Sequence, residues 1–169
     1  ELGFFDKAEF ANFRQLHSIL QGHPDMKKIP GVDASSGSLG QGVSLAVGMA
    51  LGAKHQWKDI KVYTVLGDGE CQEGQVWEAF MAANHYKLDN LTVCIDNNGL
   101  QIDGRNDDVM SLGDLAGKLL AFGFHTIELA DGNDLEAVLA ALDEAVEPGK
   151  PKAILAHTVK GKGVSYMEH

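Results

Sequence analysis

The sequence predicts a doubly wound α/β domain, in which helices flank a mostly parallel sheet. Short runs rich in β-branched and aromatic residues alternate with longer stretches whose apolar residues recur at helical spacing. Residues 70–96, which separate the ends of the first two strand-like runs, have the length of one strand-helix-strand crossover. These two strands are therefore expected to be parallel neighbours. A chain of 169 residues, 44% of them hydrophobic, is enough for one core, so we expect a single domain over residues 1–169.

The expected elements follow from periodicity and from helix start and stop signals. We expect helices over residues 4–20, 43–57, 75–87, 114–123 and 135–146, and strands over residues 62–66, 91–95, 125–129 and 153–158. Asp6 is placed to cap the first helix, and Gly123 to end the fourth in a left-handed turn. Ser111 with Asp114, and Asn133 with Glu136, have the spacing of capping boxes.

Two segments stand apart from this alternation. Residues 21–40 show no periodicity, and a loop of this length in a domain is usually functional or disordered. The helix that follows carries Gly42, Ala46, Ala50 and Ala53 at intervals of three or four. This small-residue face suits close packing against a helix of another protomer, and it suits packing on the domain's own sheet equally well.

Charge and composition exclude several classes of protein. The net charge of -10 and a pI near 5.0 argue against binding to nucleic acid or to an anionic membrane. No apolar run has the length of a membrane span, and the N-terminus lacks a signal-peptide pattern. Cys71 and Cys94 lack the spacing of a disulfide framework or a zinc site, so we expect a reducing, cytoplasmic setting. The chain starts at Glu1 and stops without a capping pattern, so both ends are expected to be cut from a longer protein.

Polar residues follow both of the first two strands. Gly67-Asp68-Gly69 ends the first, and Asp96-Asn97-Asn98-Gly99 ends the second. Because parallel strands place their carboxyl ends at one edge of the sheet, the two loops are expected to meet where open α/β folds bind ligands. Each loop also has a purely structural interpretation. Gly-Asp-Gly is often only a tight turn, and Asn-Gly between apolar runs is a strong hairpin signal, with residues 100–102 as the return strand.

A dinucleotide site is the first alternative for a glycine-rich loop between a strand and a helix. The third glycine is Gly74, too far along the chain, and Asp68, Glu70 and Glu73 surround the place that a bare pyrophosphate would occupy. The Gly-Lys-Ser/Thr of a nucleotide-hydrolysing P-loop is absent from the sequence. A divalent cation between these acids and a diphosphate resolves the repulsion. Mg²⁺ suits such a site because it prefers few protein ligands together with phosphate oxygens.

GDG followed after this interval by NN resembles the signature of thiamine diphosphate enzymes. The segments GHPDMKKIPGVDASSGSLGQG, GDGECQEGQVWEA, DNNGLQIDG and HTVKGKGVSYME are similar to segments of transketolases, and they stand in transketolase order. The resemblance covers essentially the whole chain. It implies the diphosphate-binding domain of the transketolase family, with thiamine diphosphate and Mg²⁺ (or Ca²⁺) as cofactors.

The resemblance also implies roles for individual residues. Asp68, the Asn98 side chain and the Leu100 carbonyl would hold the metal, and the Gly69 amide would touch the diphosphate. Gly37 and Leu39 would face the rings of the cofactor, and His23 would be the catalytic, substrate-facing histidine. The further cofactor-binding candidates are Gly67, Glu73, Asn98, Ile102 and Lys160.

Some of these residues have equally simple structural interpretations. His23 beside a proline could be an ordinary loop histidine, and Lys160 and Lys162 could be solvated loop lysines rather than phosphate ligands. Glu73 and Glu78 fall in the first turns of a helix, where the helix dipole favours acids. The resemblance instead places Glu73 and Glu78 toward a subunit interface near the cofactor.

The resemblance implies transfer of a two-carbon ketol unit between sugar phosphates. A serine-lysine-glycine-histidine segment, a later histidine and the pyrimidine-binding domain of the family are not in the sequence. The last of these carries the glutamate that activates the aminopyrimidine, so we expect a pyrimidine-binding subunit or domain as partner, an inactive isolated chain, and a homo-oligomer. The alternatives are a deoxyxylulose-phosphate synthase, a 2-oxo-acid dehydrogenase component, and a non-catalytic cofactor-binding or scaffold module.

Overall fold

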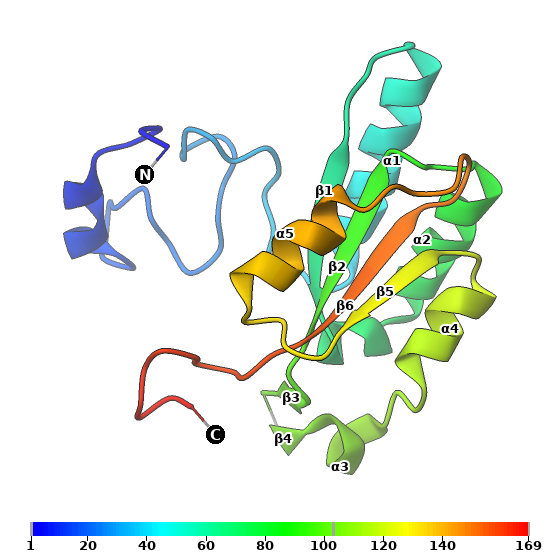
Figure 1. Cartoon of the computed structure of the whole chain (residues 1–169). Coiled ribbons are helices and arrows are strands. Elements are labelled where there is room, and N and C mark those ends of the chain that lie inside the picture. Colours follow the sequence, from blue (N-terminus) through cyan, green and yellow to red (C-terminus); the bar gives the residue numbers. More distant parts are fainter. Residues whose placement is uncertain (1, 103, 169) are drawn as a thin grey trace.

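The computed structural model describes residues 2–102 and 104–168. Within them the larger sheet is parallel and has the strand order β1-β2-β6-β5, and β3 and β4 form a small antiparallel ribbon (Figure 1). The strands are β1 Val62–Gly67, β2 Leu91–Asn97, β3 Leu100–Gln101, β4 Gly104–Arg105, β5 His125–Leu129 and β6 Lys152–His157. The helices are η1 Lys7–Asn12, α1 Gln41–His55, η2 Gly69–Gln72, α2 Gly74–His85, α3 Asn106–Met110, α4 Leu115–Ala121 and α5 Leu135–Asp143.

The core lies between the sheet and one layer of helices. α1 and α2 cover one face of the sheet, and α5 lies on the other (Figure 1). The stripe predicted for the second long helix is fully formed, because Val76, Ala79, Phe80 and Ala83 are all buried. Phe80 packs edge-on against Phe124, with ring centroids 5.0 Å apart. The prediction of a doubly wound, mostly parallel α/β domain is confirmed.

The small-residue face of α1 packs inside the domain. Ala46, Ala50 and Ala53 are at most 6% exposed, and the first two belong to the core cluster that also contains the buried side chains of α2 and the sheet. The apolar residues that α1 leaves exposed are larger ones, including Leu45 and Met49. Of the two interpretations of this face, the one in which it packs on the domain's own sheet and helices is therefore correct.

The local structure differs from the sequence analysis in three places. The helix expected over residues 4–20 shrinks to the 3₁₀ turn η1, although Asp6 does cap it by accepting from the Ala8 amide at 2.8 Å. The hairpin alternative after Asn98 also fails, because β3 pairs with β4 and not with β2. Short α3 is missing from the predicted elements, since five residues are too few to show helical periodicity.

Both predicted capping boxes are displaced toward the helix. Asp114 itself caps α4 by accepting from the Gly117 amide at 2.8 Å, and Asp134 caps α5 by accepting from the Glu136 amide at 3.0 Å. Asn133 has another partner, because its Oδ1 accepts from the Val159 amide at 2.8 Å across the sheet edge. Gly123 does end α4 with a positive φ of 85°, as predicted.

Candidate functional site

The loops after β1 and β2 meet at the carboxyl edge of the sheet. The two strands are parallel and in register, with Gly67 opposite Asp96, so both strands leave the sheet at the same level. The Asp68 amide then donates to the Asp96 carbonyl at 3.1 Å, which extends the ladder by one residue into the loops. The predicted meeting of these loops is confirmed.

Asp68 ties the two loops together. Its side chain is 1% exposed, and its Oδ1 accepts from the Gly69 amide at 2.8 Å. Its Oδ2 accepts from the Gly99 amide at 2.6 Å, so the carboxylate spans both loops. Each carboxylate oxygen has a second lone pair, which leaves the group able to bind a cation as well. Asp68 is not on an exposed surface, and its substitution therefore affects the structure of the loops as well as ligand binding.

The second loop is held by its own side chains. Asn98 donates from Nδ2 to Asp96 at 3.1 Å, and its Oδ1 accepts from the Leu100 amide at 3.0 Å. The other Asp96 oxygen accepts from the hydroxyl of Thr158, just beyond β6. Asp68, Asp96 and the Asn98 amide thus stand at the ends of neighbouring strands as a set of hard oxygen donors.

Gly69 lies where the backbone is closely covered. A Cβ built on Gly69 would lie 2.9 Å from the Gln101 Cβ and 3.2 Å from Oδ1 of Asn106. Asn106 is itself buried and accepts from Gln101 Nε2 at 2.9 Å. The segment after β2 therefore folds back over the Gly-Asp-Gly loop and limits the residue at position 69 to glycine.

The long loop of residues 21–40 brings His23 and Gly37 into contact. The Ser36 amide donates to the Pro24 carbonyl at 3.4 Å, and the Met26 amide donates to Ser35 Oγ at 3.1 Å. Gly37 has a φ of 131°, and a Cβ there would overlap the imidazole ring of His23. The two residues, predicted from different motifs, are neighbours in the structure.

The same loop is fastened to the strand ends by Glu70, a residue that the sequence does not single out as a ligand. Its Oε1 accepts from the Gly40 amide at 2.8 Å, and its Oε2 accepts from the Gly67 amide at 3.1 Å. Gly40 has a positive φ of 79° and is the N-cap of α1, and a Cβ there would lie 3.0 Å from the Glu73 Cβ. Glu70 and Gly40 are 30 residues apart, and no periodicity or motif signals their contact.

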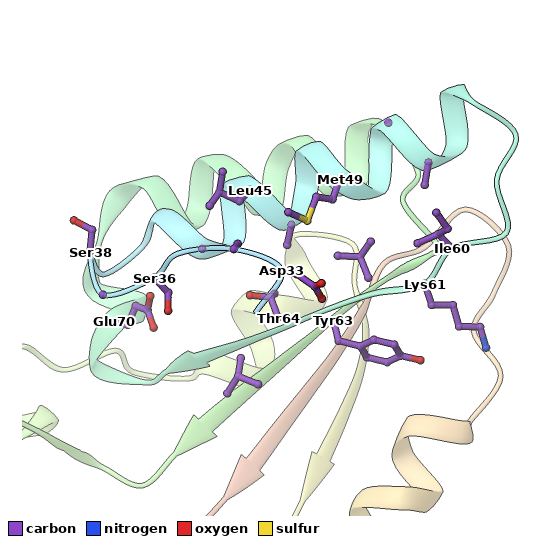
Figure 2. A pocket seen from close by; sticks show the side chains of 18 of the residues that line it. Asp33, Ser36, Ser38, Leu45, Met49, Ile60, Lys61, Tyr63, Thr64 and Glu70 are labelled. Carbon is purple, nitrogen blue, oxygen red and sulfur yellow. The ribbon is translucent and has the colours of Figure 1, made fainter. Parts of the chain in front are cut away.

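Besides a hollow of about 320 Å³ that Asp68 and Gly99 line, two hollows beside these loops contain predicted cofactor-binding residues. One of about 1020 Å³ runs between α1 and β1, and Ser36, Gly37, Leu39 and Glu70 line one part of it (Figure 2). The other, of about 500 Å³, contains Lys160 and Lys162 together with Asp96, Asn98 and Asn133. Lys160 therefore lies at the same edge of the sheet as Asn98.

The remaining candidates are more peripheral. Leu39 is 57% exposed, and Ile102 is 96% exposed and lines neither of these two hollows. Glu73 is the N-cap of α2, and Glu78 is an exposed residue of its first turns. Both acids thus occupy the helix positions that their structural interpretation requires.

Negatively charged side chains surround the site. Burial raises the pKa of the Cys71 thiol to about 12, and the negative charges of Glu70 and Asp68 contribute to the rise. Among residues 2–102 and 104–168, no three His, Cys, Asp or Glu side chains converge as a metal-binding group. A cation here would therefore need amide or carbonyl oxygens and ligand phosphates beside Asp68, which is the coordination that Mg²⁺ accepts.

The fold and the paired loops define a parallel α/β domain whose carboxyl edge is acidic and lined by oxygen atoms. The chain belongs to the transketolase family, because the model of the family "Transketolase, thiamine diphosphate binding domain" matches residues 3–169. No helix in the described part of the chain has the length and apolar character needed to cross a membrane.

Named relatives include components of split enzymes. The chain is 42% identical over 167 residues to a subunit of the apulose-4-phosphate transketolase of Phocaeicola vulgatus, and the match covers 98% of the chain and 59% of that relative. It is 40% identical to the 6-deoxy-6-sulfo-D-fructose transketolase subunit SqwG of a Clostridium species, with 98% of the chain and 60% of the relative covered. The chain thus spans about 60% of the length of these relatives.

Solved transketolases share the fold. The structure superposes on transketolase from Leishmania mexicana with a TM-score of 0.87 and 36% identity, over 92% of this chain and 25% of that one. The corresponding values for the Campylobacter jejuni transketolase are 0.83, 36%, 92% and 26%.

Proposed function

We propose that this chain is the diphosphate-binding part of a transketolase. In this function it binds Mg²⁺ and thiamine diphosphate for the transfer of a two-carbon ketol unit between ketose and aldose phosphates. One observation carries the proposal: in a member of this family, the buried Asp68 carboxylate joins the loops after two adjacent parallel strands, 2.6 Å from the Gly99 amide. Membership of the transketolase family also favours this reaction over those of other thiamine diphosphate enzymes.

The donor set fits the cofactor. Asp68, the Asn98 amide oxygen and the Leu100 carbonyl are hard oxygen ligands for Mg²⁺ or Ca²⁺, and the cation would neutralise the diphosphate beside Asp96 and Glu70. Gly67 and Gly69 lie in the loop that would contact the diphosphate. When bound, thiamine diphosphate supplies the carbon chemistry of ketol transfer, while the protein supplies position and charge.

Further residues of this chain orient the ligands. Gly37 and Leu39 line the hollow that would take the rings of the cofactor, and His23, which packs on Gly37, would contact the sugar substrate. Lys160, in the hollow that also contains Asn98, is available to phosphate oxygens. Glu73 and Ile102 complete the proposed cofactor-binding residues. Glu73 packs beside Gly40, at the end of the loop that contains Gly37 and Leu39.

We further propose that catalysis requires a pyrimidine-binding domain, carried by a second subunit or by a longer chain. The proposal is supported by the relatives named as transketolase subunits, of which this chain spans about 60%. Homo-oligomerisation and a cytoplasmic location stay predictions, to be checked by light scattering and by cell fractionation.

The cofactor proposal is tested by calorimetric titration of thiamine diphosphate with and without Mg²⁺. We expect Mg²⁺-dependent binding to the wild type and a loss of about tenfold or more in Asp68→Asn, since the variant lacks the charge that attracts the cation. Asn is preferred to Ala because it keeps an acceptor for one of the two loop amides. Asp108→Asn, which removes an exposed charge from α3, is the matched control and should bind normally. Unchanged affinity in Asp68→Asn at an unchanged melting temperature would refute the metal assignment.

A further inference from the structure

Glu70 occupies an unusual position between two parts of the proposed cofactor site. Its carboxylate accepts from the Gly40 amide at 2.8 Å and from the Gly67 amide at 3.1 Å. Gly40 ends the loop that contains Gly37 and Leu39, whereas Gly67 ends β1 and begins the Gly-Asp-Gly loop. A single half-buried side chain therefore bridges the loop on the ring side and the loop on the diphosphate side.

Both amides lie where the backbone of the fold offers them no acceptor. Gly67 belongs to the edge strand β1, and since the Val62 and Asp68 amides face β2, alternation turns the Gly67 amide outward, away from the sheet. Gly40 is buried at the N-cap of α1, where backbone N–H groups lack intrahelical acceptors. A carboxylate satisfies both donors at once, and its charge is favoured by the N-terminal end of a 15-residue helix.

Glu70 also borders the hollow beside the loop that precedes α1. It lines the hollow between α1 and β1 together with Ser36, Gly37 and Leu39 (Figure 2). Asp68, two residues earlier, uses its oxygens on Gly69 and Gly99 instead. The two acids thus divide the site: Asp68 joins the loops after β1 and β2, and Glu70 joins the loop before α1 to the end of β1.

We propose that Glu70 is a positioning residue that holds the ring-side loop, residues 36–40, against the diphosphate-side loop, residues 67–69. It fixes the distance between the groups that contact the two ends of thiamine diphosphate without binding the cofactor itself. This inference rests on the proposed function, because it assigns the two loops to the two ends of that cofactor.

The test compares two ligands that are expected to contact different loops of the protein. Mg²⁺ with thiamine diphosphate requires both loops, whereas Mg²⁺ with inorganic pyrophosphate requires only the diphosphate side. In Glu70→Gln one acceptor oxygen is replaced by an NH₂ group that faces a backbone N–H, so one of the two loop contacts is lost. We expect the affinity for thiamine diphosphate to fall about tenfold, and the affinity for pyrophosphate to change less than about threefold. Glu147→Gln, at an exposed acid far along the chain, removes the same charge and should change neither affinity.

A second readout keeps the two proposals separable. Hydrogen exchange of at least one of the two amides, Gly40 or Gly67, should accelerate about tenfold or more in Glu70→Gln without ligand, while the amides of β2 keep their protection. Equal losses for both ligands, or unchanged affinity for thiamine diphosphate, would overturn the positioning role, as would unchanged exchange at Gly40 and Gly67. If the wild type binds neither ligand, the proposed function fails, and the exchange measurement still decides whether Glu70 holds the loops.

Discussion

The carboxylates of two acids in this site accept hydrogen bonds from backbone amides. Asp68 satisfies the amides of Gly69 and Gly99, and Glu70 satisfies those of Gly40 and Gly67. Their charges reinforce one another in a partly buried region, which makes an additional positive charge favourable there. The loops are therefore pre-organised by the same carboxylates that would attract a metal ion, so binding need not order them first.

The acids also make a prediction for the neighbouring thiol. Cys71 is fully buried, and burial together with Glu70 and Asp68 raises its pKa to about 12. At pH 8 only about one molecule in ten thousand then carries the reactive thiolate at this position. Iodoacetamide should therefore label Cys71 only after unfolding in guanidinium. Cys94 is only partly buried, so it should also be labelled in the native protein, but slowly, because burial raises its pKa as well. Peptide mass spectrometry measures both, and native labelling of Cys71 would contradict the raised pKa.

The same shift predicts a dependence of stability on pH. Because the folded pKa of about 12 lies above the ordinary value of 9.0, the stability due to Cys71 is present below pH 9 and is lost as the pH rises toward 12. In urea unfolding, the free energy of unfolding should fall with a slope to which Cys71 contributes about 1.4 kcal/mol per pH unit in this window. Cys71→Ala should show a shallower slope, since other groups continue to titrate in both proteins. Equal slopes in the two proteins would show that the pKa of the Cys71 thiol is not raised in the folded state.

At the scale of elements, strands are more predictable than caps. β5 has the predicted bounds, and the other three strands of the large sheet differ from prediction by one or two residues, because short runs that contain β-branched and aromatic residues favour strands. The displaced caps of α4 and α5 fail for a different reason. The observed caps Asp114 and Asp134 lie three residues and one residue after the expected caps. Asn133 does not cap α5 because its side chain accepts from the Val159 amide, 26 residues later in the chain.

The candidate site divides in the same way. The meeting of the Gly-Asp-Gly and Asn-Asn loops follows from strand order alone, so the sequence predicts it. The burial of Asp68, the contact of His23 with Gly37 and the bridge made by Glu70 depend on tertiary contacts between loops. No local periodicity encodes such contacts, so they could be found only in the structure.

The junction between the long loop and α1 makes a prediction about two glycines. Gly40 has a left-handed φ of 79°, and its Cβ position lies 3.0 Å from the Glu73 Cβ. Gly40→Ala should therefore lower the free energy of unfolding by about 1–3 kcal/mol. Gly48, inside α1 with nothing within 4 Å of its Cβ position, is the matched control. Gly48→Ala should raise stability by about 0.5–1 kcal/mol, since alanine favours a helix interior. Urea denaturation measures both, and an equally harmless Gly40→Ala would contradict the tight junction.

The whole molecule leaves much apolar surface uncovered. Phe4, Phe10, Phe13 and Leu16 in the N-terminal segment are each more than half exposed, and this segment runs beside the sheet rather than over it (Figure 1). On the edge strand β1, Tyr63 and Val65 are 54% and 72% exposed. Parallel sheets in proteins are normally covered on both faces. The chain spans about 60% of its relatives from split transketolases, and this uncovered surface is consistent with the partner subunit or domain proposed above.

The last prediction concerns that assembly. With thiamine diphosphate and Mg²⁺, the chain alone should show negligible ketol transfer, because none of its glutamates is matched to the pyrimidine-activating residue of the family. Adding the pyrimidine-binding subunit of a split transketolase should produce activity that saturates with the concentration of that subunit. The Asp68→Asn chain should fail to support this activity, whereas Asp108→Asn should support it fully. A coupled assay of ketose and aldose phosphates measures the rate. Turnover by the chain alone would refute the requirement for a partner, and a mixture that binds cofactor but stays inactive would favour a non-catalytic cofactor-binding module.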